Sequence, residues 1–120
     1  MSHAHRTIES YVHNGRIGVL VEFALDTDFT ARLPEFKQLT RDLALQVAAA
    51  PVSTVEELLA QTYVKDETLT VDELISNASR HLGERIAITR FVRWDAEAKQ
   101  SPPSEPPREL AAAARVRKIA

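Results

Sequence analysis

Asp26 and Asp28 are the pair of side chains in this sequence whose spacing is closest to a catalytic arrangement. They stand two residues apart, directly after an apolar run, with Thr27 between them. Paired carboxylates can act as general acid and base when a pocket holds them. No other pattern in the sequence indicates such a pocket, and Asp and Thr at this position are typical of a helix cap. We therefore interpret the pair as a cap.

The histidines and the known catalytic motifs do not indicate a reaction either. His3 and His5 could bind a metal ion, but no third ligand accompanies them, and His13 and His81 are isolated. The sequence has no cysteine, no glycine-rich phosphate loop, no GxSxG and no HExxH. We expect no metal site, no cofactor and no enzymatic activity, and we predict a protein that works by contact.

Length and charge limit the remaining function classes. A chain of 120 residues supports one compact domain and at most a short appendage. The net charge of −2 argues against direct binding of nucleic acid. No apolar run approaches the ~20 residues that span a bilayer, and the first ten residues lack the core of a signal peptide. We expect a cytoplasmic protein with no membrane contact.

The first third of the sequence predicts a β-hairpin followed by a helix. Asn14-Gly15 separates a weakly alternating run, residues 7–13, from a strongly apolar run that starts at Ile17. Asn-Gly between two strand-like runs favours a type I′ turn, because both central residues need positive φ. An apolar stripe with helical spacing follows over residues 34–50, with Pro34 in the first turn.

The second half predicts two more helices and one strand. The spacings Ser53–Glu56 and Thr70–Glu73 are those of capping boxes, and Gly83 is well placed to end the second of these helices. Residues 85–94 alternate again. We expect their apolar side chains to face one way, with Arg90 interrupting that face near a rim or an interface. The apolar side chains of that face are Ile86, Ile88, Val92 and Trp94.

Together these elements predict an α+β fold with a three-stranded antiparallel sheet packed on one face by helices. We assign residues 1–95 to this core domain. The Pro-rich residues 96–107 are predicted to be a linker, since "SPPSEPP" favours a semi-rigid polyproline conformation. Residues 108–120 have strong helix propensity without a wide apolar stripe, so we expect a separate C-terminal helix.

Phe29 is unusual, because a large aromatic stands where the chain should turn through solvent. The stretch that contains it, "IESYVHNGRIGVLVEFALDTDFTAR" at 8–32, continues into "EFKQLTRDLALQVAAA" at 35–50. Both resemble the core domain of translation elongation factor Ts. So does "LLAQTYVKDETLTVDELISNASRHLGERIAITRFVRW" at 58–94, with that family's closing helix, Gly-Glu turn and last strand. The resemblance covers residues 8–95 in the right order.

The resemblance implies a guanine-nucleotide exchange factor that binds the GTPase elongation factor Tu and promotes GDP release during translation elongation. In that family the Thr-Asp-Phe tip is pushed against the nucleotide-binding domain of the partner. Carried over, Asp28 and Phe29 would contact the GTPase, with Thr27 and Arg32 shaping the loop. From the residues alone, Phe29 could instead fold back over the first long helix near Phe36.

The sequence also departs from the family pattern. The usual N-terminal helical domain is not seen before the first strand, so we expect a truncated member. Some family members pair one core as a two-fold dimer, and Arg90, Val92 and Trp94 are our candidates for that surface. Two alternatives stay open. One is a Tu-binding or dimerisation module without exchange activity, and the other is a repurposed scaffold that recognises an unrelated partner through its C-terminal helix.

Overall fold

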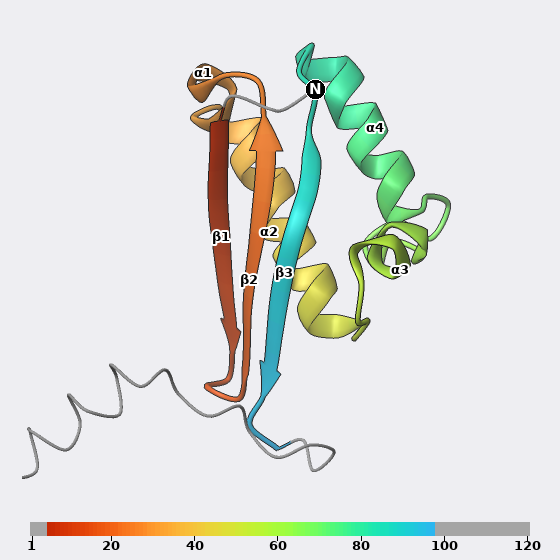
Figure 1. The fold of residues 1–120 in the computed structure, drawn as a ribbon. Helices are drawn as coiled ribbons and strands as arrows, with labels where there is room; N and C mark the ends of the chain where they lie inside the picture. The colour runs from red at the N-terminus through yellow and green to blue at the C-terminus, as the bar shows by residue number, and fades with distance from the viewer. Residues whose placement is uncertain (1–4, 98–120) are drawn as a thin grey trace, which may run out of the picture.

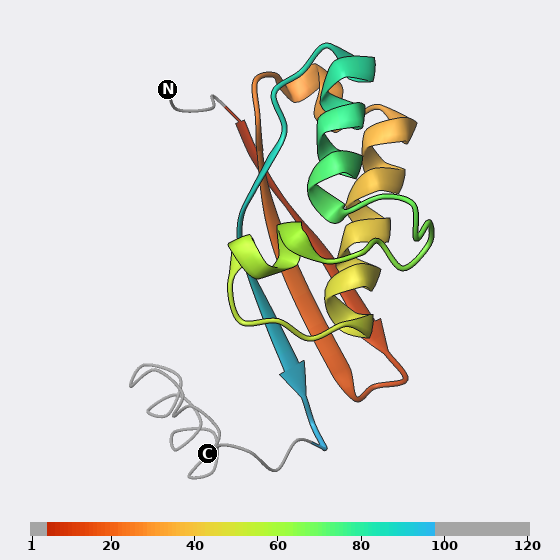
Figure 2. The ribbon, with the colours of Figure 1, turned by 90° about the vertical axis from the view of Figure 1, so that its right-hand side faces the viewer.

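The fold has two layers, a three-stranded antiparallel sheet and a set of helices on one of its faces. The computed structural model describes residues 5–97. Figure 1 looks onto the sheet with α2 behind it, and Figure 2 shows the same layers from the side. The predicted α+β class is therefore confirmed. The predicted linker, apart from residues 96 and 97, and the predicted C-terminal helix lie outside the described residues. The elements in order are β1 (His5–His13), β2 (Ile17–Leu25), α1 (Asp28–Ala31), α2 (Pro34–Ala49), α3 (Val55–Ala60), α4 (Val71–Leu82) and β3 (Ala87–Asp95).

The hairpin between β1 and β2 forms where Asn14-Gly15 predicts it. Asn14 and Gly15 have φ values of 52° and 67°, and the Arg16 N–H donates to the His13 carbonyl at 2.9 Å. The two strands pair from His13↔Ile17 to His5↔Leu25. β2 also pairs with β3, so β2 is the central strand of the order β1-β2-β3. The turn thus sets the register of the strand that leads into Asp26.

The strand β3 corrects one prediction, because its apolar side chains do not share a face. Ile88 is 7% exposed, whereas Val92 and Trp94 are 47% and 78% exposed. The cause is an irregularity in the ladder between Glu22 and Phe23: Glu22 pairs with Arg90, but Phe23 pairs with Ile88. The extra residue, Thr89, forms a β-bulge that shifts the alternation by one position.

Arg93 lies on the inner side of the sheet as a result of this shift. Its Nε and Nη2 groups donate to the Ala48 carbonyl at 3.3 and 3.0 Å. A cation at the last turn of a helix satisfies carbonyls that have no partner within the helix and complements the helix dipole. The bulge therefore allows β3 to fix the C-terminal end of α2.

The helix ends follow local sequence signals, with one correction. Thr70 and Glu73 form the predicted capping box of α4, and Gly83 ends that helix in the left-handed region with φ 63°. The predicted cap at Ser53 is wrong: α3 is capped by Thr54, whose side chain accepts from the Glu57 N–H. Both spacings occur in "STVEE". The structure uses the later one, and Leu58 of this helix is fully buried in the core.

The core lies between the sheet and α2, and α3 and α4 close it at the β3 side. Phe23 and Phe36 pack edge to face with their ring centroids 6.1 Å apart, the arrangement that aromatic pairs favour. The apolar stripe predicted for α2 is buried as far as Val47, and α4 buries Val71 and Ile75. This packed body carries the turn that follows β2. The fully buried side chains of greatest volume are Phe23, Phe36, Leu25, Leu43, Leu58, Gln46, Val21, Val47 and Val71.

Candidate partner-binding tip

The turn after β2, residues 26–32, is the candidate site, and we call it the tip. β2 ends at Leu25, and α1 forms a single helical turn before α2 begins. Thr27 caps α1: it is extended (φ −134°, ψ 150°), and its Oγ1 accepts from the Thr30 N–H at 3.3 Å. The Arg32 N–H donates back to the carbonyls of Phe29 and Thr30. A helix cap therefore lies in the Asp-Thr-Asp stretch as expected, but Thr27 forms it, while Asp28 is the first residue of α1 and Asp26 accepts from Arg85.

Phe29 points outward from this turn. Its side chain is 66% exposed, whereas its neighbour Thr30 is 4% exposed. Phe36, toward which Phe29 could have folded, is buried against Phe23 instead. The alternative in which Phe29 covers the start of the long helix therefore does not match its exposure. The tip presents one large aromatic to solvent over a buried base.

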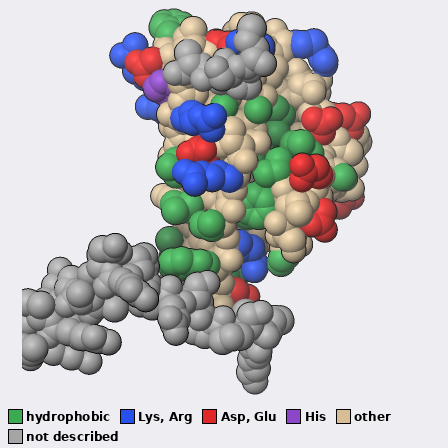
Figure 3. All heavy atoms as spheres, viewed as in Figure 1, with side chains coloured by type: hydrophobic (Ala, Val, Ile, Leu, Met, Phe, Trp, Pro, Cys, Tyr) green, Lys and Arg blue, Asp and Glu red, His purple; other side chains and the backbone are tan. Residues whose placement is uncertain are grey.

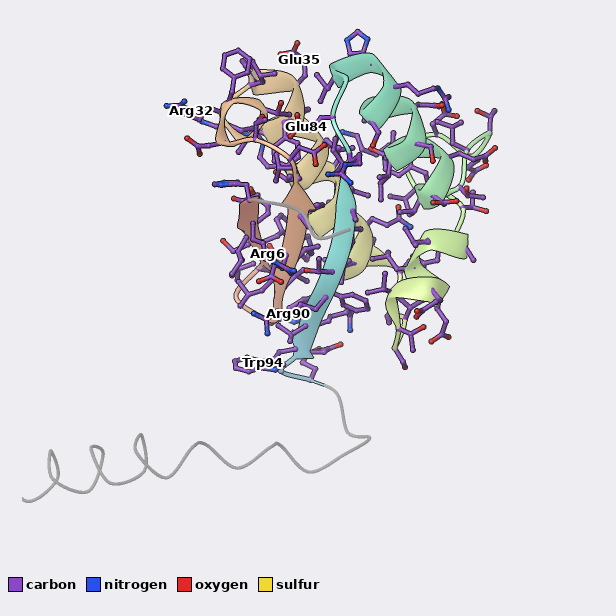
Figure 4. The ribbon with its side chains drawn as sticks, turned by 45° about the horizontal axis from the view of Figure 1, so that its top comes forward. Arg6, Arg32, Glu35, Glu84, Arg90 and Trp94 are labelled. Carbon is purple, nitrogen blue, oxygen red and sulfur yellow. The ribbon has the colours of Figure 1, made fainter. Side chains whose placement is uncertain are left out.

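Two consecutive residues after α4 hold the base of the tip. The Glu84 side chain accepts from the Thr27 N–H at 2.6 Å and from the Thr30 hydroxyl at 3.0 Å. The Arg85 N–H and Nε both donate to Asp26, at 3.0 and 2.9 Å. These bonds raise the pKa of the Arg85 guanidinium further above its ordinary value. Figure 4 shows Glu84 between α1 and the start of β3.

The roles of Glu84 and Arg85 are not visible in the sequence, where local patterns indicate only a turn after Gly83. Their partners lie 54 to 59 residues earlier in the chain, so no local spacing signals the contact. The one hint is a carboxylate directly after a helix-ending glycine, and so short a pattern does not specify a distant partner.

The charged side chains of the tip lie on its outer side. Asp28 is 3.5 Å from Arg32, the C-cap residue of α1, and 3.6 Å from the imidazole of His5 at the start of β1. The Asp28 and Arg32 side chains are 61% and 70% exposed, so both can change partners at little cost. The structure therefore brings the four predicted contact residues, 27, 28, 29 and 32, into one turn with distinct roles: two exposed charges, one exposed aromatic, and the helix cap Thr27, which is also exposed.

The remaining chemical candidates do not form a second site within residues 5–97. In this part of the chain, no group of three or more acidic or histidine side chains is placed to hold a metal ion. His3 lies outside it. A depression of about 560 Å³ lies beside Glu84 and Arg85, between α4 and the start of β3, and Asp26, Ser79 and Ile86 also line it. None of the helices described in residues 5–97 is long and apolar enough to cross a membrane.

The face of the sheet opposite the helices carries the predicted interface residues. Arg90, Val92 and Trp94 all lie on this open face, with Glu22 paired to Arg90 and Leu20 paired to Val92. Figure 3 shows basic and acidic side chains toward its upper part and hydrophobic ones toward its lower end. The exposed hydrophobic residues of β1, β2 and β3 on this face are Ile8, Val12, Leu20, Val92 and Trp94.

Charge on the open face is concentrated at Glu22. Its carboxylate accepts from Thr89 at 2.7 Å and from Arg90 at 3.1 Å, and Arg6 lies 3.3 Å away. The hydrogen bond from Thr89, then that from Arg90, lowers the pKa of Glu22 below its ordinary value. The upper part of the open face is thus already paired within the chain.

Comparison of the sequence with known proteins shows the family of this chain. The sequence model of the family Elongation factor TS matches residues 26–102. Elongation factor Ts of Nostoc sp. is 44% identical over 88 residues, covering 72% of this chain and 28% of that protein. Elongation factor Ts of Myxococcus xanthus is 32% identical, covering 73% and 61%, and that of Rubrobacter xylanophilus is 34% identical, covering 73% and 69%. The chain therefore spans only part of these relatives, and it belongs to the elongation factor Ts family.

Proposed function

We propose that this chain binds a Tu-like GTPase and promotes release of its GDP by inserting Phe29 into the partner. The observation that carries the proposal is an aromatic side chain that is 66% exposed on a turn whose base is hydrogen bonded from a second segment. Membership of the elongation factor Ts family supports the identity of the partner.

The mechanism requires binding that differs between two states of the GTPase. A ligand shifts an equilibrium only as far as its affinities for the two states differ. In the proposed step, Phe29 enters a pocket that opens only when the partner's contacts to GDP are loosened. Coupling is reciprocal, so bound GDP weakens the binding of this chain by the same factor.

Phe29 alone does not supply all of the required free energy. Fully burying a phenylalanine contributes ~1.5–3 kcal/mol, which is less than a tightly held nucleotide requires. Asp28 adds a second contact: its carboxylate is exposed and can exchange Arg32 and His5 for groups of the partner. Further contacts around the tip contribute the remainder.

The experiment follows the release of a fluorescent GDP analogue from elongation factor Tu. The native chain is added to the loaded GTPase, beside Phe29→Ala and the matched control Val64→Ala. Val64 is also an exposed hydrophobic residue, 43% exposed, but it lies in the loop after α3. We expect faster release with the native chain and with Val64→Ala, and a much smaller acceleration with Phe29→Ala. Binding without faster release would favour the alternative of a Tu-binding module without exchange activity.

We propose as well that two copies of the chain pair through their open sheet faces. The face bears hydrophobic side chains at its lower end, and Trp94 is the most exposed of these at 78%. Glu22 and Arg90 place both signs of charge on the same face, so it is compatible with a copy of itself related by a two-fold axis. A core of this size also benefits from the additional burial, because small domains bury a low fraction of their surface.

A further inference from the structure

Glu84 is a buried carboxylate whose hydrogen bonds go to the tip. It is 7% exposed and lies just after the helix-ending Gly83. One oxygen accepts the Thr27 N–H at 2.6 Å, and the other accepts the Thr30 hydroxyl at 3.0 Å, with the Thr27 hydroxyl 3.3 Å away. These donors lie on both sides of Phe29. A single side chain from more than 50 residues later in the sequence therefore holds the backbone before Phe29 and the side chain after it.

The geometry of Phe29 depends on this contact, because α1 is too short to be stable alone. It has four residues, and an isolated helix of that length does not form in water. The backbone N–H of its cap, Thr27, is tied to the body by the hydrogen bond to Glu84. Hydrogen bonds to an ionised carboxylate are stronger than those between neutral groups, and a buried donor such as the Thr30 hydroxyl is costly to leave unpaired.

We propose that Glu84 is a positioning residue that presents Phe29 to the partner. It does not touch the GTPase in this scheme. It fixes Thr27 and Thr30, so that Phe29 is already directed outward before binding and less ordering is required during the exchange step. Arg85 supports the same arrangement by holding Asp26 at the end of β2. The inference rests on the proposed function, and its test separates the two.

The first experiment is a double-mutant cycle on the rate of GDP release. The single variant Glu84→Ala is compared with the native chain. The double variant that carries both Glu84→Ala and Phe29→Ala is compared with the single variant Phe29→Ala. We expect Glu84→Ala to lower the accelerated rate about tenfold, because freeing one backbone residue of the tip has an effect of that order. In the Phe29→Ala background we expect less than about a twofold change, since Glu84 then has no aromatic to position.

Two conservative variants keep the test valid if Glu84→Ala fails to fold. Glu84→Gln retains an acceptor for the Thr27 N–H, and the threonine hydroxyls can rotate to accept from its amide, so most of the rate should be recovered. Thr30→Val removes one donor with little change of shape and should lower the rate in the same direction. Equal loss of rate in both Phe29 backgrounds would overturn the positioning role, as would full activity of Glu84→Ala.

The second experiment does not involve the GTPase. Amide hydrogen exchange is measured by NMR for residues 27–31 in the native chain, Glu84→Ala and the control Glu73→Ala. Glu73 belongs to the capping box of α4, so its loss should lower the stability of the fold without selective exchange at the tip. We expect selectively faster exchange of residues 27–31 in Glu84→Ala. Unchanged protection there would overturn the inference.

The two experiments distinguish the failure of the function from the failure of the inference. If the native chain does not accelerate GDP release, the proposed function is wrong. The amide exchange of residues 27–31 then still decides whether Glu84 holds the tip.

Discussion

Phe29→Ala separates a functional aromatic from a structural one, because its effects on stability and on activity should diverge. Phe29 is 66% exposed, and substitutions at such surface positions usually change the free energy of unfolding by no more than ~0.5 kcal/mol. Alanine also has a higher helix propensity than phenylalanine, which favours the single turn of α1. We therefore expect the variant to fold as the native chain does.

The expected loss of activity follows from the area that a partner can still cover. Burying a phenylalanine completely contributes ~1.5–3 kcal/mol. Because 66% of the residue is exposed in the free chain, about two thirds of that amount, ~1–2 kcal/mol, is available to the complex. This corresponds to a factor of about 5 to 30 in the rate of GDP release at subsaturating concentration.

Two measurements check the prediction, the release of fluorescent GDP from elongation factor Tu and the thermal midpoint of the free chain. For a domain of this size, ~1 kcal/mol shifts the midpoint by about 4–8 °C. A large fall of the midpoint in Phe29→Ala would show that the aromatic stabilises the fold, and the reasoning from exposure would be wrong. An unchanged rate of release beside an active native chain would show that the tip does not act through Phe29.

Three further predictions concern the rest of the molecule. Trp94→Glu places a charge on the most exposed hydrophobic position of the open face, so we expect sedimentation to show a dimer for the native chain and a monomer for the variant. Glu22 has a folded pKa below the ordinary 4.5, mainly through Thr89 and then Arg90. Its contribution to stability is therefore complete above pH 4.5 and is lost as the pH falls through the lower folded pKa. In the variant Glu22→Gln, the thermal midpoint should therefore depend less on pH in that acidic range. Tyr63 has its pKa raised to about 12 from 10.0, first by burial and then by the charge of Asp42. Stability should therefore fall as the pH rises from 10.0 toward 12, and Tyr63→Phe should show a smaller fall in urea unfolding; equal falls in both chains would contradict the assignment.

Features set by neighbours in the sequence could be predicted without the structure. The Asn14-Gly15 turn, the Thr70 capping box and the end of α4 at Gly83 each depend on atoms within a few residues. The position of α3 shows the limit of such signals. Ser53 and Thr54 offer equally good local caps, and only the structure shows that the second is used.

The face of β3 could not be predicted in the same way. Alternation predicts one apolar face only if the ladder is regular, and the bulge at Thr89 moves Val92 and Trp94 to the side opposite Ile88. Thr89 is stabilised there by its hydrogen bond to Glu22 on the neighbouring strand. When apolar side chains lie on both faces of a strand, the alternation of apolar and polar residues in its sequence does not reveal a bulge.

The sequence alone determined the three strands, the three longer helices, their order and the family, because helix caps, turns and apolar periodicity are interactions between near neighbours. It also marked Phe29 as unusual. Only the tertiary structure decided that Phe29 is exposed, that Glu84 and Arg85 hold the tip, and that Trp94 lies on the open face. Each of these depends on strand pairing or on side chains from the segment between α4 and β3 meeting residues more than 50 positions earlier. Such contacts form only when the sheet and the helices pack, because the fold brings together residues that are far apart in the sequence.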